Sequence, residues 1–211
     1  MPREWDVWKY CNNYFSKHKI NMMAFEFKIQ LQGVSNPPVW RRLKISEKFS
    51  FEQMHIAIQN TFGWTNSHLH LFSPEGFDSS PQIGMPYEDS EEEILDSGKI
   101  IMKDIFKNEK QTFIYIYDFG DTWTHMITLE KITTEKIKTP SCIGGKGKCP
   151  PEDCGGHWGY KDFLQILSNP KHPEYQSTRY WAGLEDGEEW NAKEFDLKEA
   201  NEMAGKTWLD F

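Results

Sequence analysis

The sequence predicts an α+β protein, with a mainly antiparallel sheet and helices packed on one face. Residues 113–129 show period-two patterning, rich in aromatic and β-branched side chains, on both sides of a Phe-Gly-Asp turn, as the two strands of a hairpin do. Residues 25–31 alternate in the same way. Residues 51–62 instead repeat apolar side chains every three or four positions, the spacing of a helix with one buried face.

The chain is expected to consist of an N-terminal helical extension (residues 1–21) and a single domain (residues 22–211). Trp5, Trp8 and Phe15 recur at helical spacing and predict the extension. The domain should begin with strands at residues 25–32 and 39–45. A turn from Gly33 to Pro38 should separate them, because proline cannot donate to a β-ladder.

The next segment carries clear helix boundaries. Ser50 and Gln53 form a capping box at the helix start, and Gly63 suits the left-handed position just after its end. The elements expected after it are a strand (68–72), a long excursion with short strand pieces (73–97), a helical turn (102–106), the central hairpin (113–129), a lysine-rich exit from the sheet (132–139), a Cys/Pro/Gly loop (140–159), and helices starting near Gly159, spanning 174–182, and capped by Asp196 with Glu199.

Length and charge limit the classes of function. A chain of 211 residues can bury one sizeable core, and its net charge of −8 makes general binding to nucleic acid unfavourable. The candidate basic cluster is lysine-rich, and a solvated face explains it better than nucleic-acid contact does. Its members are Lys131, Lys136, Lys138, Lys146 and Lys148.

The sequence favours a cytoplasmic protein. No apolar run approaches the roughly 20 residues of a membrane helix, and the first residues lack the apolar core and cleavage site of a signal peptide. In a reducing compartment, the four cysteines indicate free thiols or a metal site rather than a disulfide framework.

A first candidate site gathers imidazoles and carboxylates around the hairpin turn: His68, His70, Asp118, Asp121 and His125. Residues two apart on a strand face the same side, so His68 and His70 could bind one metal. The aspartates would complete a mixed N/O site suited to Zn, Mn or Fe(II), and an activated water there would permit hydrolysis.

Structural roles are the alternative for each of these residues. His125 shares a strand face with Trp123 and Ile127, as a core histidine would. Asp118 and Asp121 could hydrogen-bond turn amides or pair with Arg41 or Arg42.

A second candidate site is a zinc centre formed by Cys142, Cys149, Cys154 and His157. Three thiolates and an imidazole could stabilise a loop without a core of its own. Free thiols, or a disulfide between Cys149 and Cys154, are the alternatives. Between these cysteines, Glu152 and Asp153 could act as an acid/base pair, or remain solvated or cap the following helix.

Four motifs in order resemble the Ri-plasmid (pRiA) ORF-three-like family over about residues 22–205. They are Pro38-Val39-Trp40-Arg41-Arg42, the stretch from Phe62 to Phe72, the stretch from Tyr117 to His125, and Cys149 to Gly156 followed by Gly159-Tyr160. The resemblance implies a small α+β domain in a prokaryote. Members of the family are often uncharacterised, and some carry a resolvase-like label from mobile elements.

We therefore expect a binding or interaction module with an unknown ligand or protein partner, associated with plasmids or mobile elements. A metal-dependent hydrolase or nuclease using the His/Asp residues is the first alternative, and a DNA-associated accessory protein is the second. The sequence contains no nucleotide-binding loop, dinucleotide fingerprint, nucleophile elbow or His-Glu-x-x-His motif. Zinc is the cofactor that the cysteine loop would bind.

Overall fold

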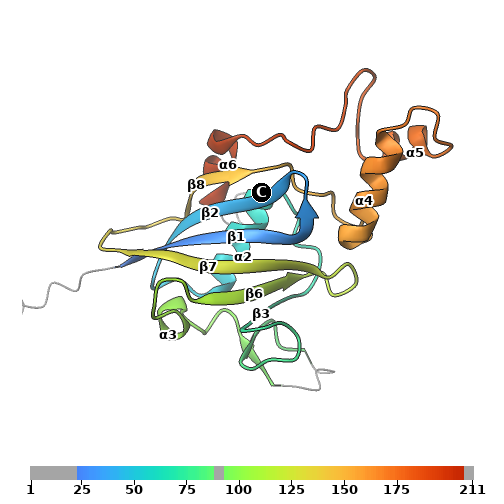
Figure 1. The fold of residues 1–211 in the computed structure, drawn as a ribbon. Helices are drawn as coiled ribbons and strands as arrows, with labels where there is room; N and C mark the ends of the chain where they lie inside the picture. The colour runs from blue at the N-terminus through green and yellow to red at the C-terminus, as the bar shows by residue number, and fades with distance from the viewer. Residues whose placement is uncertain (1–22, 88–92, 207–211) are drawn as a thin grey trace, which may run out of the picture.

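The computed structural model describes residues 23–87 and 93–206 (Figure 1), so the predicted N-terminal helical extension (residues 1–21) lies outside the described residues. In chain order the elements are β1 (Ala24–Ser35), β2 (Pro38–Ser46), α2 (Phe51–Phe62), β3 (His70–Ser73), β4 (Gln82–Gly84), β5 (Ile94–Asp96), α3 (Met102–Ile105), β6 (Thr112–Tyr117), β7 (Trp123–Thr133), β8 (Ser141–Lys146), α4 (Gly156–Leu167), α5 (Tyr175–Trp181) and α6 (Leu197–Ala204).

The strands form one eight-stranded sheet in the order β5-β4-β3-β6-β7-β1-β2-β8. The pairs are antiparallel except for β4 and β5, which run parallel. The predicted hairpin lies at the centre, with Tyr115 opposite His125 and Tyr117 opposite Trp123. The predicted fold class, α+β with a mainly antiparallel sheet, is confirmed.

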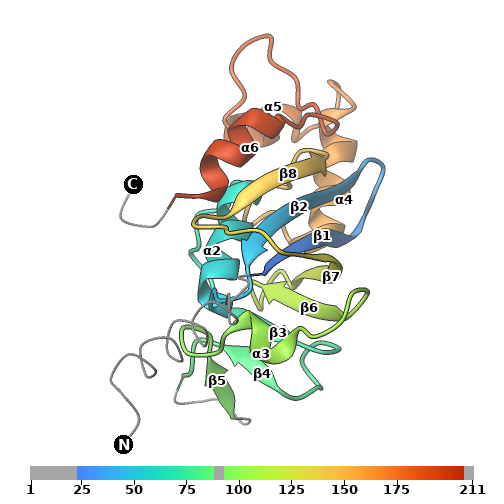
Figure 2. The same cartoon turned by 90° about the vertical axis from the view of Figure 1, so that its left-hand side faces the viewer.

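Helices α2 and α6 lie behind the sheet in the view of Figure 1 and to one side of it in Figure 2. Buried side chains of β1 alternate with partly exposed polar ones, so one face of the sheet packs against α2. Ser50 and Gln53 form the predicted capping box, and Gly63 ends α2 with a φ of 81°. In the described part of the chain, no helix is long and apolar enough to cross a bilayer.

Helices α4 and α5 lie beyond the β1–β2 turn (Figure 1). A Cβ on Gly33, near the end of β1, would stand 2.6 Å from the ring of His157, so the start of α4 packs directly on glycine there. The predicted helices at 159–167 and 174–182 are confirmed as α4 and α5, although α4 begins three residues earlier. Asp196 accepts hydrogen bonds from the amides of Lys198 and Glu199 at the start of α6.

The end of β1 and the segment at residues 141–146 also differ from the prediction. β1 continues to Ser35, so the turn is confined to Asn36 and Pro37. Gly33 lies within β1, where the register with β2 is irregular between Gln30 and Ser35. Residues 141–146, predicted as loop, form the edge strand β8 paired with β2. Their glycines have little intrinsic strand preference, but the free edge of β2 supplies partners for their backbone groups.

Candidate functional site

Three loops meet at one end of the central strands. They are the segment Gly63–Leu69 after α2, the turn Asp118–Thr122 between β6 and β7, and the segment Gly147–Gly155 before α4. Asp118 donates its backbone N–H to the carbonyl of Leu69 at 2.9 Å, which joins the first two loops. The Oδ2 of Asp121 accepts a hydrogen bond from the N–H of Gly155 at 3.0 Å, which joins the turn to the third loop.

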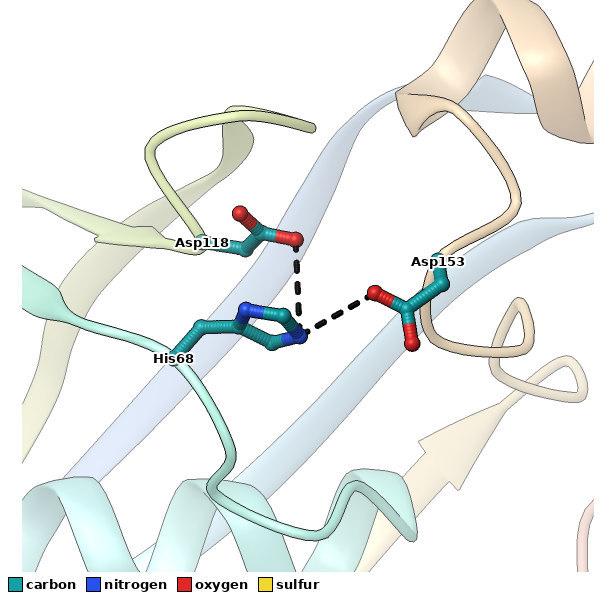
Figure 3. Close-up of side chains that lie close together, drawn as sticks. All are labelled: His68, Asp118 and Asp153. Atoms are coloured by element: carbon teal, nitrogen blue, oxygen red, sulfur yellow. Dashed lines mark ion pairs between the residues drawn. The ribbon is translucent and has the colours of Figure 1, made fainter.

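One side chain from each loop contributes to a cluster of His68, Asp118 and Asp153 (Figure 3). The Nε2 of His68 lies 3.7 Å from Asp118 Oδ2 and 3.2 Å from Asp153 Oδ1. This nitrogen is shielded from solvent and forms no hydrogen bond of acceptable geometry with any described residue. Within residues 23–87 and 93–206, these three form the group whose potential ligand atoms all lie within 4.8 Å of one another.

The spacing of these atoms suits a bound cation. Two bonds of about 2.1 Å at a tetrahedral angle place their ligand atoms about 3.4 Å apart. The two measured separations from His68 Nε2 bracket that value. One imidazole and two carboxylates form a ligand set for Zn, Mn or Fe(II).

The two carboxylates are held by unusual backbone conformations. Asp118 and Asp153 have φ values of 56° and 59°, in the left-handed region that non-glycine residues seldom adopt. Asp118 Oδ1 accepts from the N–H of Gly120 at 2.9 Å, which leaves Oδ2 directed at His68. Backbone strain of this kind persists only where surrounding contacts impose it.

Glu152 anchors the third loop to the other two. Its Oε1 accepts a hydrogen bond of 2.5 Å from the hydroxyl of Tyr117, and its Oε2 accepts from the N–H and hydroxyl of Thr65 at 2.9 and 2.6 Å. Burial and the hydrogen bond to Glu152 raise the pKa of Tyr117, so its hydroxyl remains a donor at neutral pH. Glu152 and Asp153 therefore point to different partners, Tyr117 with Thr65 and His68, respectively, and an acid/base role for the two stays a prediction.

A closed ring of hydrogen bonds joins the first loop to α2 and β6. Gln59 Nε2 donates to the hydroxyl of Tyr115, which lies 2.8 Å from Nδ1 of His55. Nε2 of His55 lies 2.6 Å from Oδ1 of Asn66, and the N–H of Asn66 donates to Oε1 of Gln59. Because Asn66 Oδ1 can only accept, Nε2 of His55 carries the proton and Nδ1 accepts from Tyr115.

The remaining residues of the first candidate site are not part of this cluster. Strand β3 starts at His70, so His68 lies in the loop before it, and the pair does not converge on one metal. His70 stacks on His55 instead, with ring centroids 3.6 Å apart. Asp121 binds the amide of Gly155, as described above.

His125 lies in the core, as the alternative interpretation expected. It is fully buried, Nδ1 lies 3.0 Å from the carbonyl of Trp123, and burial lowers its pKa to about 3. Neither arginine pairs with the aspartates of the turn. Arg42 pairs with Glu130, whereas Arg41 donates to main-chain carbonyls that include that of Thr61.

The residues of the predicted zinc centre are spread around the third loop. Among Cys142, Cys149, Cys154 and His157, no three place their ligand atoms within 4.8 Å of one another. The three cysteines are free thiols. Burial raises the pKa of all three thiols, that of Cys154 to about 12, so they are protonated at neutral pH in this arrangement.

The family model described as plasmid pRiA4b ORF-3-like protein matches residues 23–199. The chain belongs to this family. The uncharacterised protein y4hQ of Sinorhizobium fredii is 32% identical over 186 residues, which cover 86% of this chain and 92% of that protein. The crystal structure of MM3350, a protein of unknown function from Methanosarcina mazei, is similar with a TM-score of 0.72 and 32% identity, covering 84% of this chain and 96% of that one.

The motifs that indicated the plasmid pRiA4b ORF-3-like family are the three loops that meet at the cluster, together with the start of β2. Sequence reasoning missed Asp153 as a partner of His68. Its one signal was its place in the Cys149–Gly156 motif, since the other two members of the cluster also come from motifs of this family.

Proposed function

We propose that this protein is a binding module that holds a divalent cation between His68, Asp118 and Asp153 and uses it to bind its ligand. The observation that carries the proposal is the position of His68 Nε2, which is buried, forms no hydrogen bond of acceptable geometry, and lies between two carboxylate oxygens at 3.2 and 3.7 Å. A buried nitrogen without a hydrogen bond is costly, and a cation would satisfy it and neutralise the two carboxylates together.

Three protein ligands leave coordination positions open. Structural zinc sites close with four protein ligands, whereas three leave room for water or a ligand group. The side chain of Asp153 is 69% exposed, so the cation would be reached from solvent on that side. The supporting observations for a binding role are therefore an incomplete ligand set and an accessible edge.

The proposal is tested by titrating Mn²⁺ and Zn²⁺ into chelator-treated protein by calorimetry. We expect one site, and at least tenfold weaker affinity in Asp118→Asn and Asp153→Asn, because each removes a ligand charge. Asp162→Asn, an exposed carboxylate on α4, is the matched control and should bind as the parent does. Equal affinity in all four proteins, or no stoichiometric binding, would contradict the proposal.

Metal-dependent hydrolysis is the second candidate function. The observation that favours it is the same incomplete ligand set, since an open position on a bound cation can hold and activate a water molecule. Cation-dependent cleavage of an ester, amide or phosphodiester that disappears in Asp118→Asn, but not in Asp162→Asn, would establish it.

We also propose that residues 22–211 form a single domain, that the protein is cytoplasmic, and that it is associated with plasmids or mobile elements. A DNA-associated role would use the lysine cluster named above, in which Lys148 pairs with Glu194 at 2.8 Å. Zinc at the four-residue set of cysteines and His157 remains a prediction that metal analysis of protein purified without chelator will test.

A further inference from the structure

A cavity of about 500 Å³ lies beside the cation site, between the first turns of α2, the loop before β3, and the segments around β4 and β5. His68 lines it, and so do both rings of the His55–His70 stack. The cation-binding proposal does not use this cavity.

His70 is the unpartnered polar group of the cavity. It is 6% exposed, and its Nε2 is buried and forms no hydrogen bond with a described residue, whereas both nitrogens of the adjoining His55 are occupied. A neutral imidazole offers one acceptor lone pair. Buried polar groups without partners are uncommon in proteins and mark places where a partner is missing.

The charges that face the cavity are acidic. Glu52 and Asp96 line it, and no lysine or arginine of the described residues does. Asp96 pairs with Lys99 at 2.9 Å, whereas Glu52 forms no ion pair within the part of the chain that the structure describes. Ile56, Leu69 and Met85 add apolar surface to the same lining. A phosphate or carboxylate ligand would find no lysine or arginine of the described residues here, whereas an ammonium group would find a carboxylate and a neutral acceptor.

We propose that this cavity binds a primary ammonium group on a short aliphatic chain, with the ammonium hydrogen-bonded to His70 and attracted to Glu52. The chain would lie against Ile56, Leu69 and Met85. A free small amine and a lysine side chain of a peptide share this chemistry. The site adjoins the cation site through His68 but does not depend on it.

The test follows the histidine ring resonances by NMR in chelator-treated protein at pH 7.5, so that failure of the cation proposal leaves the result unaffected. The probes are n-butylamine, 1-butanol and butyrate, at constant ionic strength. We expect saturable shifts of the His55 and His70 resonances with butylammonium, about tenfold weaker binding of butanol, and no saturable shift with butyrate. Saturation by butyrate at the same concentrations, or no saturable shift with butylammonium, would overturn the proposal.

Two variants locate the site. His70→Phe keeps an aromatic ring on His55 but removes both nitrogens, and Glu52→Gln removes the charge at an exposed position that leaves the core unchanged. Each should weaken butylammonium binding about tenfold, while Glu75→Gln, an exposed carboxylate outside the lining, should not. Undiminished binding in Glu52→Gln refutes the proposal even if His70→Phe does not fold. Nα-acetyl-lysine methylamide then distinguishes the sources: binding as tight as that of butylamine identifies a lysine side chain, and weaker binding identifies a free amine.

Discussion

Replacing Tyr115 with phenylalanine removes one oxygen atom from the centre of the hydrogen-bonded ring. Tyr115 is fully buried, and its hydroxyl lies 2.8 Å from both His55 Nδ1 and Gln59 Nε2. The substitution leaves an acceptor and a donor without partners, and each buried unsatisfied group costs roughly 1–3 kcal/mol. Since phenylalanine preserves the ring packing, we expect a loss of about 3 kcal/mol in the free energy of unfolding.

Urea unfolding followed by circular dichroism measures this loss, and the midpoint temperature should fall by roughly 6–12 °C. Tyr180→Phe is the matched control, because Tyr180 is 88% exposed and its hydroxyl forms no hydrogen bond with a described residue. Its effect should stay within about 0.5 kcal/mol. If Tyr115→Phe costs less than about 1 kcal/mol, the ring of hydrogen bonds does not contribute as described here.

Two further predictions concern pH and the packing of the third loop. The pKa values of His70 (about 4) and His125 (about 3) in the folded protein lie below the ordinary 6.5. The unfolded chain therefore binds more protons than the folded protein in this range, and stability should fall as the pH drops from 6.5 towards 4. His70→Phe should reduce the slope of unfolding free energy against pH by up to about 1.4 kcal/mol per pH unit, measured by urea unfolding across this range. An unchanged slope would refute the assigned effect of burial on the pKa of His70. Gly156→Ala should destabilise by at least about 2 kcal/mol, because Gly156 has a φ of 66° and a Cβ there would collide with the carbonyl oxygen of Asp121. Gly183→Ala, with a φ of 67° and open space around it, carries the backbone strain alone and should cost less; equal losses in thermal unfolding would remove the collision as a cause.

Much of the fold could be predicted because its signals are local. Alternation in residues 25–31 and 113–129 and the apolar stripe of residues 51–62 each depend on neighbours within a few positions, so β1, β6, β7 and α2 were found with their buried faces. The edge strand β8 was missed for the opposite reason. Its pairing with β2 depends on a partner about 100 residues away in the chain, and its own glycines do not predict a strand.

The candidate site was predicted only in part. The motifs led to the loops that meet at the cluster and to two of its members, His68 and Asp118. They also suggested His70, Asp121 and His125, which the fold directs to a stacked ring, a loop amide and the core. Spacing along a strand could not distinguish these outcomes. His68 lies just before β3 begins, so the strand alternation that would place it on the same face as His70 does not apply to it.

The sequence by itself determined the α+β class, the central hairpin, the helix caps and the family, since each is encoded in short stretches of side chains. Only the tertiary structure decided which polar groups meet. His68, Asp118 and Asp153 come together because β3 pairs with β6 and because Asp121 binds the amide of Gly155, and both contacts join segments that are distant in the chain. Periodicity reports which side of an element is buried, but only the pairing of distant elements determines what one polar group lies beside.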